Sequence, residues 1–118
     1  MDKKFLLTAS FGGSDEDGIS TSSTAISFFD TIEEALEAAK EDLSDCAYNL
    51  AESFCDEDDE EAMEEFANNY IKYYVHETEN PEAFLKEVGD SVVILEHEYV
   101  SSDDSWSHEN IYMLTKLN

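Results

Sequence analysis

The stretch DTIEEALEAAKEDLSDCAYNLAESF, residues 30–54, carries the clearest periodic pattern of the chain. Its apolar side chains recur at spacings of three and four, the repeat of a helix that buries one face. Thr31 and Glu34 match a capping box, in which a side chain and a backbone N–H at the helix start satisfy each other. The pattern predicts an amphipathic helix over residues 31–54. Its apolar stripe is Ile32, Leu36, Ala39, Leu43, Ala47, Leu50 and Phe54.

Two more helices are predicted downstream of this stretch. The apolar pattern lapses from Asp56 to Glu61 and then resumes, so we expect a break near residues 55–58 and a second helix to about residue 77. A single helix of about 47 residues is the alternative, but no heptad repeat supports it. Asn80, Pro81 and Gly89 give a cap, a first helical residue and a stop for a short helix over 81–88. In the second helix, we expect Phe66, Tyr70 and Tyr74 to face a sheet.

Strands are predicted on both sides of the helices. KKFLLTASF (3–11) alternates apolar and polar side chains, and TSSTAISFF (21–29) follows it after the turn-forming stretch GGSDEDGIS (12–20). SVVILEHEYV (91–100) and IYMLTKLN (111–118) read as a second pair, joined by a loop. We therefore predict one α+β domain, residues 1–118, with the order ββαααββ. Its four-stranded antiparallel sheet of two hairpins would pack against an acidic helical hairpin.

The net charge of the chain is extreme for a sequence with a full apolar core. Of 118 residues, 30 are acidic, six are Lys and none is Arg, which gives −24, whereas 42% of the residues are hydrophobic. A net charge of about 5 already provides solubility, and further charge destabilises a compact state by self-repulsion. Direct binding to nucleic acid or to an anionic membrane is excluded, because both would repel this chain. A basic protein is the expected partner.

The acids are densest in the predicted helical hairpin. Eight acids occupy the ten positions 56–65, and residues 30–79 hold 18 acids and two Lys. The macrodipole favours acids in a first helical turn, which accounts for about three of them. Glu37, Glu41 and Asp45 form a ridge at i, i+4 and i+8, which costs helix stability. Two helices of this length would span roughly 35 Å, or about 2 Å per acid, whereas duplex DNA presents a charge every ~1.7 Å.

Signatures of an enzyme, cofactor site or metal site are absent from the sequence or fail. There is no phosphate-binding glycine loop, no His-Glu-x-x-His and no Cys-x-x-Cys. Aligning SDEDG on a calcium loop puts Thr24 where an acid is required. His97 and His108 lie on one predicted hairpin and leave a metal-binding or enzymatic domain as a third interpretation. We expect no enzymatic activity, no cofactor and no metal.

Three single features leave alternatives open. Trp106, in the Ser- and Asp-rich loop 101–110, is either a lid on the core or an exposed anchor for a partner. Cys46 and Cys55 would lie on opposite faces of a continuous helix, so they pair only if the chain turns between them. The apolar run near the N-terminus is too short for a signal peptide, so we expect a cytoplasmic protein with reduced thiols.

In charge, size and compactness, the chain resembles the class of small acidic proteins that imitate DNA, many of them encoded by phages or mobile elements to block restriction or CRISPR nucleases. No motif carries this resemblance. It implies a non-enzymatic inhibitor that occupies the nucleic-acid channel of a host defence nuclease in the host cytoplasm. The alternative is an immunity protein or antitoxin that neutralises a basic toxin such as a nuclease. The residues expected to contact the partner are Glu33, Glu34, Glu37, Glu41, Asp42, Asp45, Glu52, Asp56, Glu57, Asp58, Asp59, Glu60, Glu61, Glu64, Glu65 and Trp106.

Overall fold

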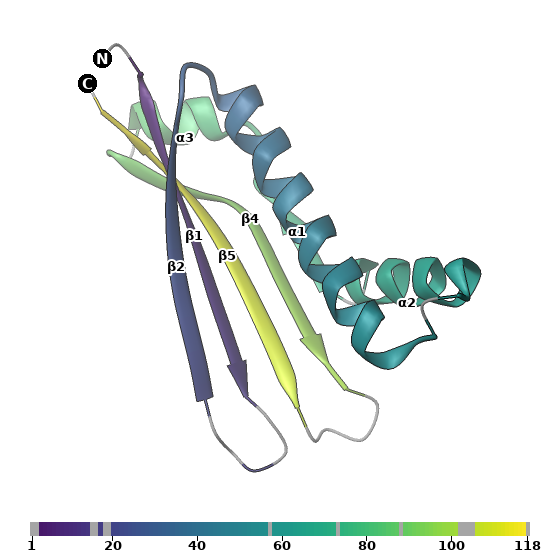
Figure 1. Cartoon of the computed structure of the whole chain (residues 1–118). Helices are drawn as coiled ribbons and strands as arrows, with labels where there is room; N and C mark the ends of the chain where they lie inside the picture. The colour runs from purple at the N-terminus through teal and green to yellow at the C-terminus, as the bar shows by residue number, and fades with distance from the viewer. Residues whose placement is uncertain are drawn as a thin grey trace.

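The computed structural model describes residues 3–14, 17, 20–56, 58–72, 74–87, 89–101 and 106–117. Along them run β1 (Phe5–Ser14), β2 (Ser20–Phe29), α1 (Ile32–Phe54), α2 (Glu60–Lys72), β3 (Tyr74–Glu77), α3 (Pro81–Glu87), β4 (Ser91–Val100) and β5 (Ser107–Lys116). Figure 1 shows these strands as one sheet with α1 lying along one of its sides. The predicted fold class, α+β with an antiparallel sheet and three helices, is confirmed.

The sheet has the strand order β2-β1-β5-β4-β3, and all neighbours are antiparallel. The two predicted hairpins, β1–β2 and β4–β5, are present, and pairing between β1 and β5 joins them in the middle of the sheet. The predicted turn between β1 and β2 and the predicted loop between β4 and β5 lie partly outside the described residues. The first and the last strand of the chain are therefore central neighbours.

A fifth strand corrects the predicted count of four. Residues Tyr74–Glu77 form β3, which pairs with β4 from Tyr74↔Glu98 to Glu77↔Leu95, so the second helix ends at Lys72 and not near residue 77. Aromatic and β-branched residues such as Tyr74 and Val75 suit an extended strand once a neighbouring strand is available. Tyr74 is accordingly 47% exposed on an edge strand, so the prediction that it faces the sheet from a helix is wrong.

The last strand is also longer than predicted. β5 begins at Ser107, four residues before the expected start, and pairs with β1 on one side and β4 on the other. The segment Ser107–Asn110 is polar, which made it look like a loop. This segment lies between two strands, whose backbone groups form hydrogen bonds with it. Its polar side chains gave no sign of this pairing.

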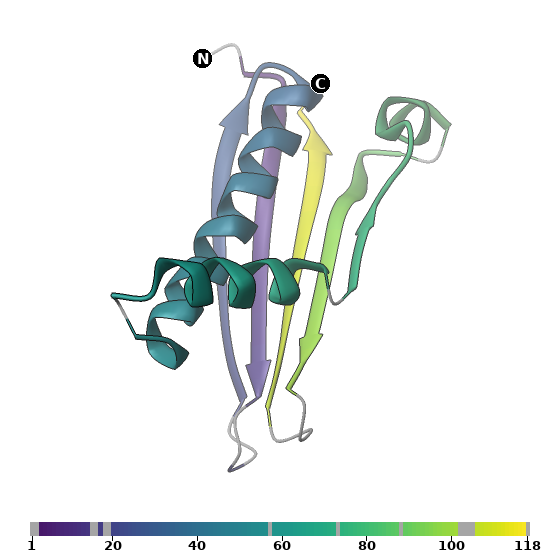
Figure 2. The same ribbon diagram turned by 90° about the vertical axis from the view of Figure 1, so that its right-hand side faces the viewer.

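The predicted helical hairpin is not formed. α2 has 13 residues against the 23 of α1, and it crosses the C-terminal half of α1 without running back along it (Figure 2). Small side chains allow this crossing: Ala47 and Ala51 of α1 and Ala67 of α2 are completely buried. Alanines let two helices approach closely, because the distance between helix axes depends on the side chains at the contact.

The helix starts follow the sequence signals. The Thr31 hydroxyl accepts a hydrogen bond from the Glu34 N–H at 3.1 Å and lies 3.1 Å from the Glu34 carboxylate, so the predicted capping box is confirmed. Asn80 accepts from the Ala83 N–H at 3.3 Å, Pro81 is the first residue of α3, and Gly89 has φ +147°. These caps fix where α1 and α3 enter the fold.

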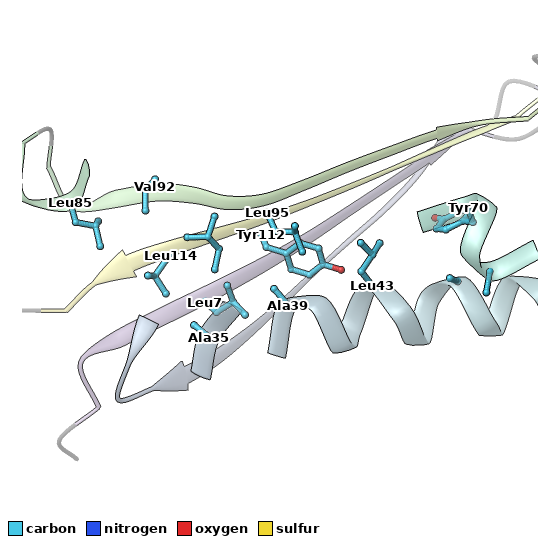
Figure 3. Packing of buried hydrophobic residues seen from close by; sticks show 13 residues of the cluster. Leu7, Ala35, Ala39, Leu43, Tyr70, Leu85, Val92, Leu95, Tyr112 and Leu114 are labelled. Carbon is cyan, nitrogen blue, oxygen red and sulfur yellow. The ribbon is translucent and has the colours of Figure 1, made fainter. Parts of the chain in front are cut away.

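The core lies between α1 and the sheet (Figure 3). Ala35 and Ala39 are completely buried, and Leu43 is 3% exposed. They pack above the sheet rows Leu7–Leu114–Val92 and Ala9–Tyr112, whose members share one face because they are paired in register. The predicted apolar stripe of α1 is thus the face that meets the sheet over its N-terminal half.

The opposite face of the sheet is not covered by α1 or α2 (Figures 1 and 2). Its apolar residues include Ile26 and Phe28 of β2, which are 61% and 43% exposed. β2 is an edge strand, and every β2 residue from Ser22 to Phe28 is exposed. Among the described helices, none combines the length and the apolar character that crossing a bilayer requires.

Candidate protein-binding surface

Fourteen of the fifteen acids predicted to contact a partner are described, and all fourteen side chains are exposed. The remaining one, Glu57, lies outside the described residues. They belong to α1, to the connection that follows it, and to α2, and all are on the side of the sheet that the helices occupy (Figure 1). We call these fourteen residues the acidic helix layer.

α1 contributes a strip of carboxylates that faces away from the sheet. At about 100° per residue, the strip lies roughly opposite the buried residues Ala35 and Ala39. Like charges three or four residues apart on a helix repel one another, so the strip is maintained at a cost to helix stability. Its members are Glu34, Glu37, Glu41, Asp45 and Glu52.

Asp42 is separate from this strip. Its carboxylate accepts a hydrogen bond from the Tyr112 hydroxyl of β5 at 2.8 Å, so the side chain turns toward the sheet. Burial is the first cause that raises the pKa of Tyr112, and the neighbouring Asp42 carboxylate raises it further. Tyr112 therefore remains a neutral donor, and Asp42 has a structural role within the predicted contact set.

Lysines neutralise almost none of this charge. Among the described residues there are two ion pairs: Lys3 with Asp30 at 3.1 Å, and Lys40 with Glu77 at 3.2 Å. Lys40 is the only cation of α1, and its partner is on β3 and not on its own helix. No described cation is therefore paired with a carboxylate of the α1 strip, which leaves it available to an external cation.

Part of the acidic run after α1 has a local structural role. Asp59 accepts from the Ala62 N–H at 3.0 Å and so caps α2, while Asp56 accepts from the Asp58 N–H at 3.3 Å. Glu60 and Glu61 occupy the first turn of α2, where the helix macrodipole favours a negative charge. Glu64 and Glu65, further along α2, have no such local explanation.

The linear charge density expected from a helical hairpin is not present. The two helices cross, so their acids do not add along one axis. α1 alone carries seven acids over a length of about 35 Å, or roughly 5 Å per acid, against about 1.7 Å per charge in duplex DNA. The acidic helix layer is therefore a two-dimensional charged surface and not a rod with the spacing of phosphates.

The charge is nevertheless sharply segregated. By sequence, none of the twenty residues of β1 and β2 is charged. Register places three acids on the open face of the described sheet: Glu96 and Glu98 of β4 and Glu109 of β5. The acidic helix layer thus holds fourteen of the 24 described acids, whereas β1 and β2, nearly half of the sheet, hold none.

The structure places Trp106 beside two rings, Tyr99 and His108, that also contact Tyr70 of α2. Its ring is half-buried and lies 5.1 Å from the ring of Tyr99 and 5.0 Å from that of His108, measured between centroids. Trp106 therefore belongs to an aromatic cluster on the β4–β5 end of the sheet.

His97 and His108 meet through Tyr70 of α2. The Tyr70 hydroxyl is 3.1 Å from His108 Nδ1, and the Tyr70 carbonyl accepts a hydrogen bond from His97 Nε2 at 2.7 Å. Burial lowers the pKa of both histidines and raises that of Tyr70 to about 12. These groups are thus neutral at pH 7, and the sequence did not indicate that an aromatic side chain of α2 would join them.

The described residues contain no arrangement of side chains that would hold a metal ion. Within the described ranges, no group of three or more His, Cys, Asp or Glu side chains is arranged to hold a metal ion. Cys46 and Cys55 are both free thiols. Comparison with family models, with curated proteins and with solved structures found no match to this chain.

Proposed function

We propose that the chain is a non-enzymatic inhibitor whose acidic helix layer binds the cationic nucleic-acid channel of another protein. The partner class is a host defence nuclease, and binding would exclude the nucleic acid from the channel. The observation that carries the proposal is the segregation of charge: unpaired, exposed carboxylates on the helices, and neutral strands β1 and β2.

Electrostatics gives this surface two expected properties. Complementary potentials steer two proteins together and raise the association rate, most strongly at low ionic strength. The same interaction weakens as salt is added, because salt screens exposed charges over about 10 Å at 0.1 M. A channel that binds phosphates depends on salt in the same way, so the two ligands would compete throughout the salt range.

The second candidate is an immunity protein or antitoxin that neutralises a basic toxin. The roughly 5 Å per acid along α1 favours it, since a folded basic toxin need not present its cations at the spacing of a duplex. Both candidates use the same surface. They differ in the partner, because a toxin is normally encoded beside its antidote.

The test is displacement from DNA. Proteins of a host lysate are loaded on DNA–cellulose at low salt and eluted with the purified chain. We expect the chain to release a discrete protein. The triple variant Glu37→Lys, Glu41→Lys, Asp45→Lys should release at least tenfold less, because it reverses the middle of the α1 strip. If the released protein is encoded next to this chain, the second candidate is favoured.

A matched control separates the surface from the net charge. Reversing Glu96, Glu98 and Glu109 to Lys changes the net charge by the same six units but alters the open face of the sheet. This control should release the partner as the unaltered chain does. Equal loss in both triple variants would show that only total charge matters, and equal release by both would exclude the α1 strip as the contact.

A further inference from the structure

A cavity of about 470 Å³ lies between the C-terminal half of α1 and the strands β1, β2 and β5. α1 starts close to the sheet and moves away from it toward its C-terminal end (Figure 1). Several strand residues below that end have small side chains: Ala9 and Ala25, which are paired, and Ser23, which is paired with Phe11. Because these side chains are too short to fill the space under the helix, a cavity remains there.

One wall of the cavity holds a buried donor that is poorly satisfied. Asn110 of β5 is 2% exposed and lines the cavity. Its side chain lies close enough to the Tyr70 hydroxyl to lower the pKa of that group, but its amide nitrogen, Nδ2, forms no hydrogen bond of good geometry with the described residues. A buried polar group is normally satisfied, and leaving it unpaired costs the whole desolvation penalty of the group. A ligand in the cavity that carries an acceptor atom would satisfy this donor.

The hydroxyls of the two tyrosines in the lining are already engaged. The Tyr112 hydroxyl donates to Asp42 at 2.8 Å, and the Tyr70 hydroxyl is hydrogen-bonded to His108 Nδ1 at 3.1 Å. Together with Phe11, these two tyrosines present aromatic surface to the cavity. Aromatic and apolar walls with few polar groups are typical of small-molecule sites, whose volumes run from about 300 to 1,000 Å³.

The charges around the cavity restrict the ligand. Asp42 is the one acidic or basic residue that lines it in the described part of the chain, apart from His108. Burial lowers the pKa of His108 and raises that of the Cys46 thiol, so both are neutral at pH 7. An anion would meet the Asp42 carboxylate and a molecule with a net charge of −24, which disfavours it.

We propose that this cavity is a binding site for a small, flat, uncharged ring compound that offers a carbonyl oxygen to the Asn110 amide. The ring would lie against Phe11, Tyr70 and Tyr112, because aromatic faces stack on one another. The site lies beneath α1, on the side of the helix away from the strip of carboxylates. Asp42 is the one residue shared with the acidic helix layer, and its carboxylate turns toward the sheet, so the two sites are tested separately.

The test uses three probes of the same shape and different charge: benzamide, benzoate and benzamidinium. Each is titrated into the isotopically labelled full chain, and the side-chain amide signal of Asn110 is followed by NMR. We expect a saturable shift with benzamide, and at least tenfold weaker binding of benzoate, which Asp42 repels. Asp42 attracts benzamidinium, but this probe has no acceptor for the Asn110 amide, and we expect that loss to outweigh the attraction and to weaken binding at least tenfold. Absence of a shift with benzamide, or tighter binding of either charged probe, would overturn the proposal.

Two variants locate the site. Asn110→Leu removes the donor and should weaken benzamide binding at least tenfold. Ser23→Trp places a large ring at the wall formed by β2 and should abolish binding, whereas Ser22→Trp, on the other face of the same strand, should leave it unchanged. The two tryptophan variants decide the matter even if Asn110→Leu does not fold. Equal binding to Ser23→Trp and Ser22→Trp would show that benzamide binds elsewhere.

Discussion

Burial lowers the pKa of two histidines, His97 and His108. His97 is completely buried, and its Nδ1 atom has no hydrogen-bond partner among the described residues. His108 is half-buried against Phe11 and Trp106. Burial disfavours the charged imidazolium in both cases, so the folded state holds fewer protons than the unfolded state below the ordinary histidine pKa of about 6.5.

This difference makes stability fall with acid. When the unfolded state binds more protons, the free energy of unfolding rises with pH, by up to about 1.4 kcal/mol per pH unit for each group. Stability is therefore full above pH 6.5 and is lost as pH falls from 6.5 toward the lowered pKa values of His97 and His108, below which no more is lost. Urea unfolding at pH 7.0, 6.0 and 5.5 should show a loss of about 1–2 kcal/mol between the first and the last value.

Substitutions assign the effect. His108→Gln should reduce the slope of stability against pH, because one of the two groups is gone. His76→Gln is the matched control, because His76 is exposed on the edge strand β3 and is not one of the two buried histidines. The measurements stay at or above pH 5.5 because carboxylates are protonated at lower pH values. Their protonation relieves charge repulsion and would raise stability, which would mask the loss caused by the histidines. A flat profile from pH 7.0 to 5.5 would contradict the burial of uncharged histidines.

Single residues also mark the limit of what the sequence can tell. Thr31 with Glu34, and Asn80 with Pro81, were predictable as caps because a cap is a local pattern a few residues long. The hydrogen bond from Tyr112 to Asp42 joins residues 70 positions apart. The place of the Asn110 amide in the cavity wall depends on three strands and a helix. Contacts of this kind follow from tertiary packing and cannot be predicted from a local sequence pattern.

Among the elements, α1 carries a pattern of charges that lowers its own stability as a helix. Glu37, Glu41 and Asp45 stand on successive turns, and each adjacent like-charged pair costs the helix a few tenths of a kcal/mol. The helix is held instead by its buried alanine and leucine face and by its N-terminal cap. Packing therefore outweighs a charge pattern that would discourage this helix in isolation.

Reversing the middle charge should stabilise the protein. Glu41→Lys turns two repulsive pairs into attractive ones, and we expect a gain of about 1 kcal/mol in the free energy of unfolding at low salt. The pair with Glu37 should contribute more, because an acid four residues before a lysine is the better orientation. Chemical denaturation measures the gain. Glu109→Lys, an equal charge change on β5, is the control and should gain less.

β3 shows why one element was assigned wrongly. Tyr70, Ile71, Tyr74 and Val75 have helical spacing, so periodicity extends the second helix past its true end at Lys72. The strand forms because β4 offers an edge with which Tyr74–Glu77 can pair. Pairing with a segment some twenty residues away is decided by the tertiary fold, which outweighs the local preference of these residues for a helix. The long helix α1 and the two hairpins were predictable because their patterns are local and strong.

For the molecule as a whole, the main unfavourable interaction is the repulsion among its negative charges. The described chain measures 46 × 30 × 26 Å. At 0.01 M salt the screening length is about 30 Å, so charges on opposite sides of the molecule repel each other; at 0.15 M it is about 8 Å, and only neighbours interact. The melting temperature should therefore rise by several degrees between these two salt concentrations.

The size of this rise depends on how many charges remain. The triple variant Glu37→Lys, Glu41→Lys, Asp45→Lys has a net charge of −18 in place of −24, since each reversal adds two units. It should melt higher at 0.01 M salt and gain less from added NaCl. Scanning calorimetry at both concentrations measures the two quantities. A melting temperature that falls with salt would mean that the carboxylates stabilise the fold, contrary to their exposed and unpaired positions.

The neutral strands β1 and β2 have a further effect, which concerns orientation. With the carboxylates on the helices and none on these strands, the centre of negative charge is displaced from the centre of mass, and the molecule has a large electric dipole. Near any cationic object, a torque turns the helices toward it before contact is made. On an anion-exchange resin the protein should therefore adsorb with one preferred side down, leaving Ile26 and Phe28 directed toward the solvent.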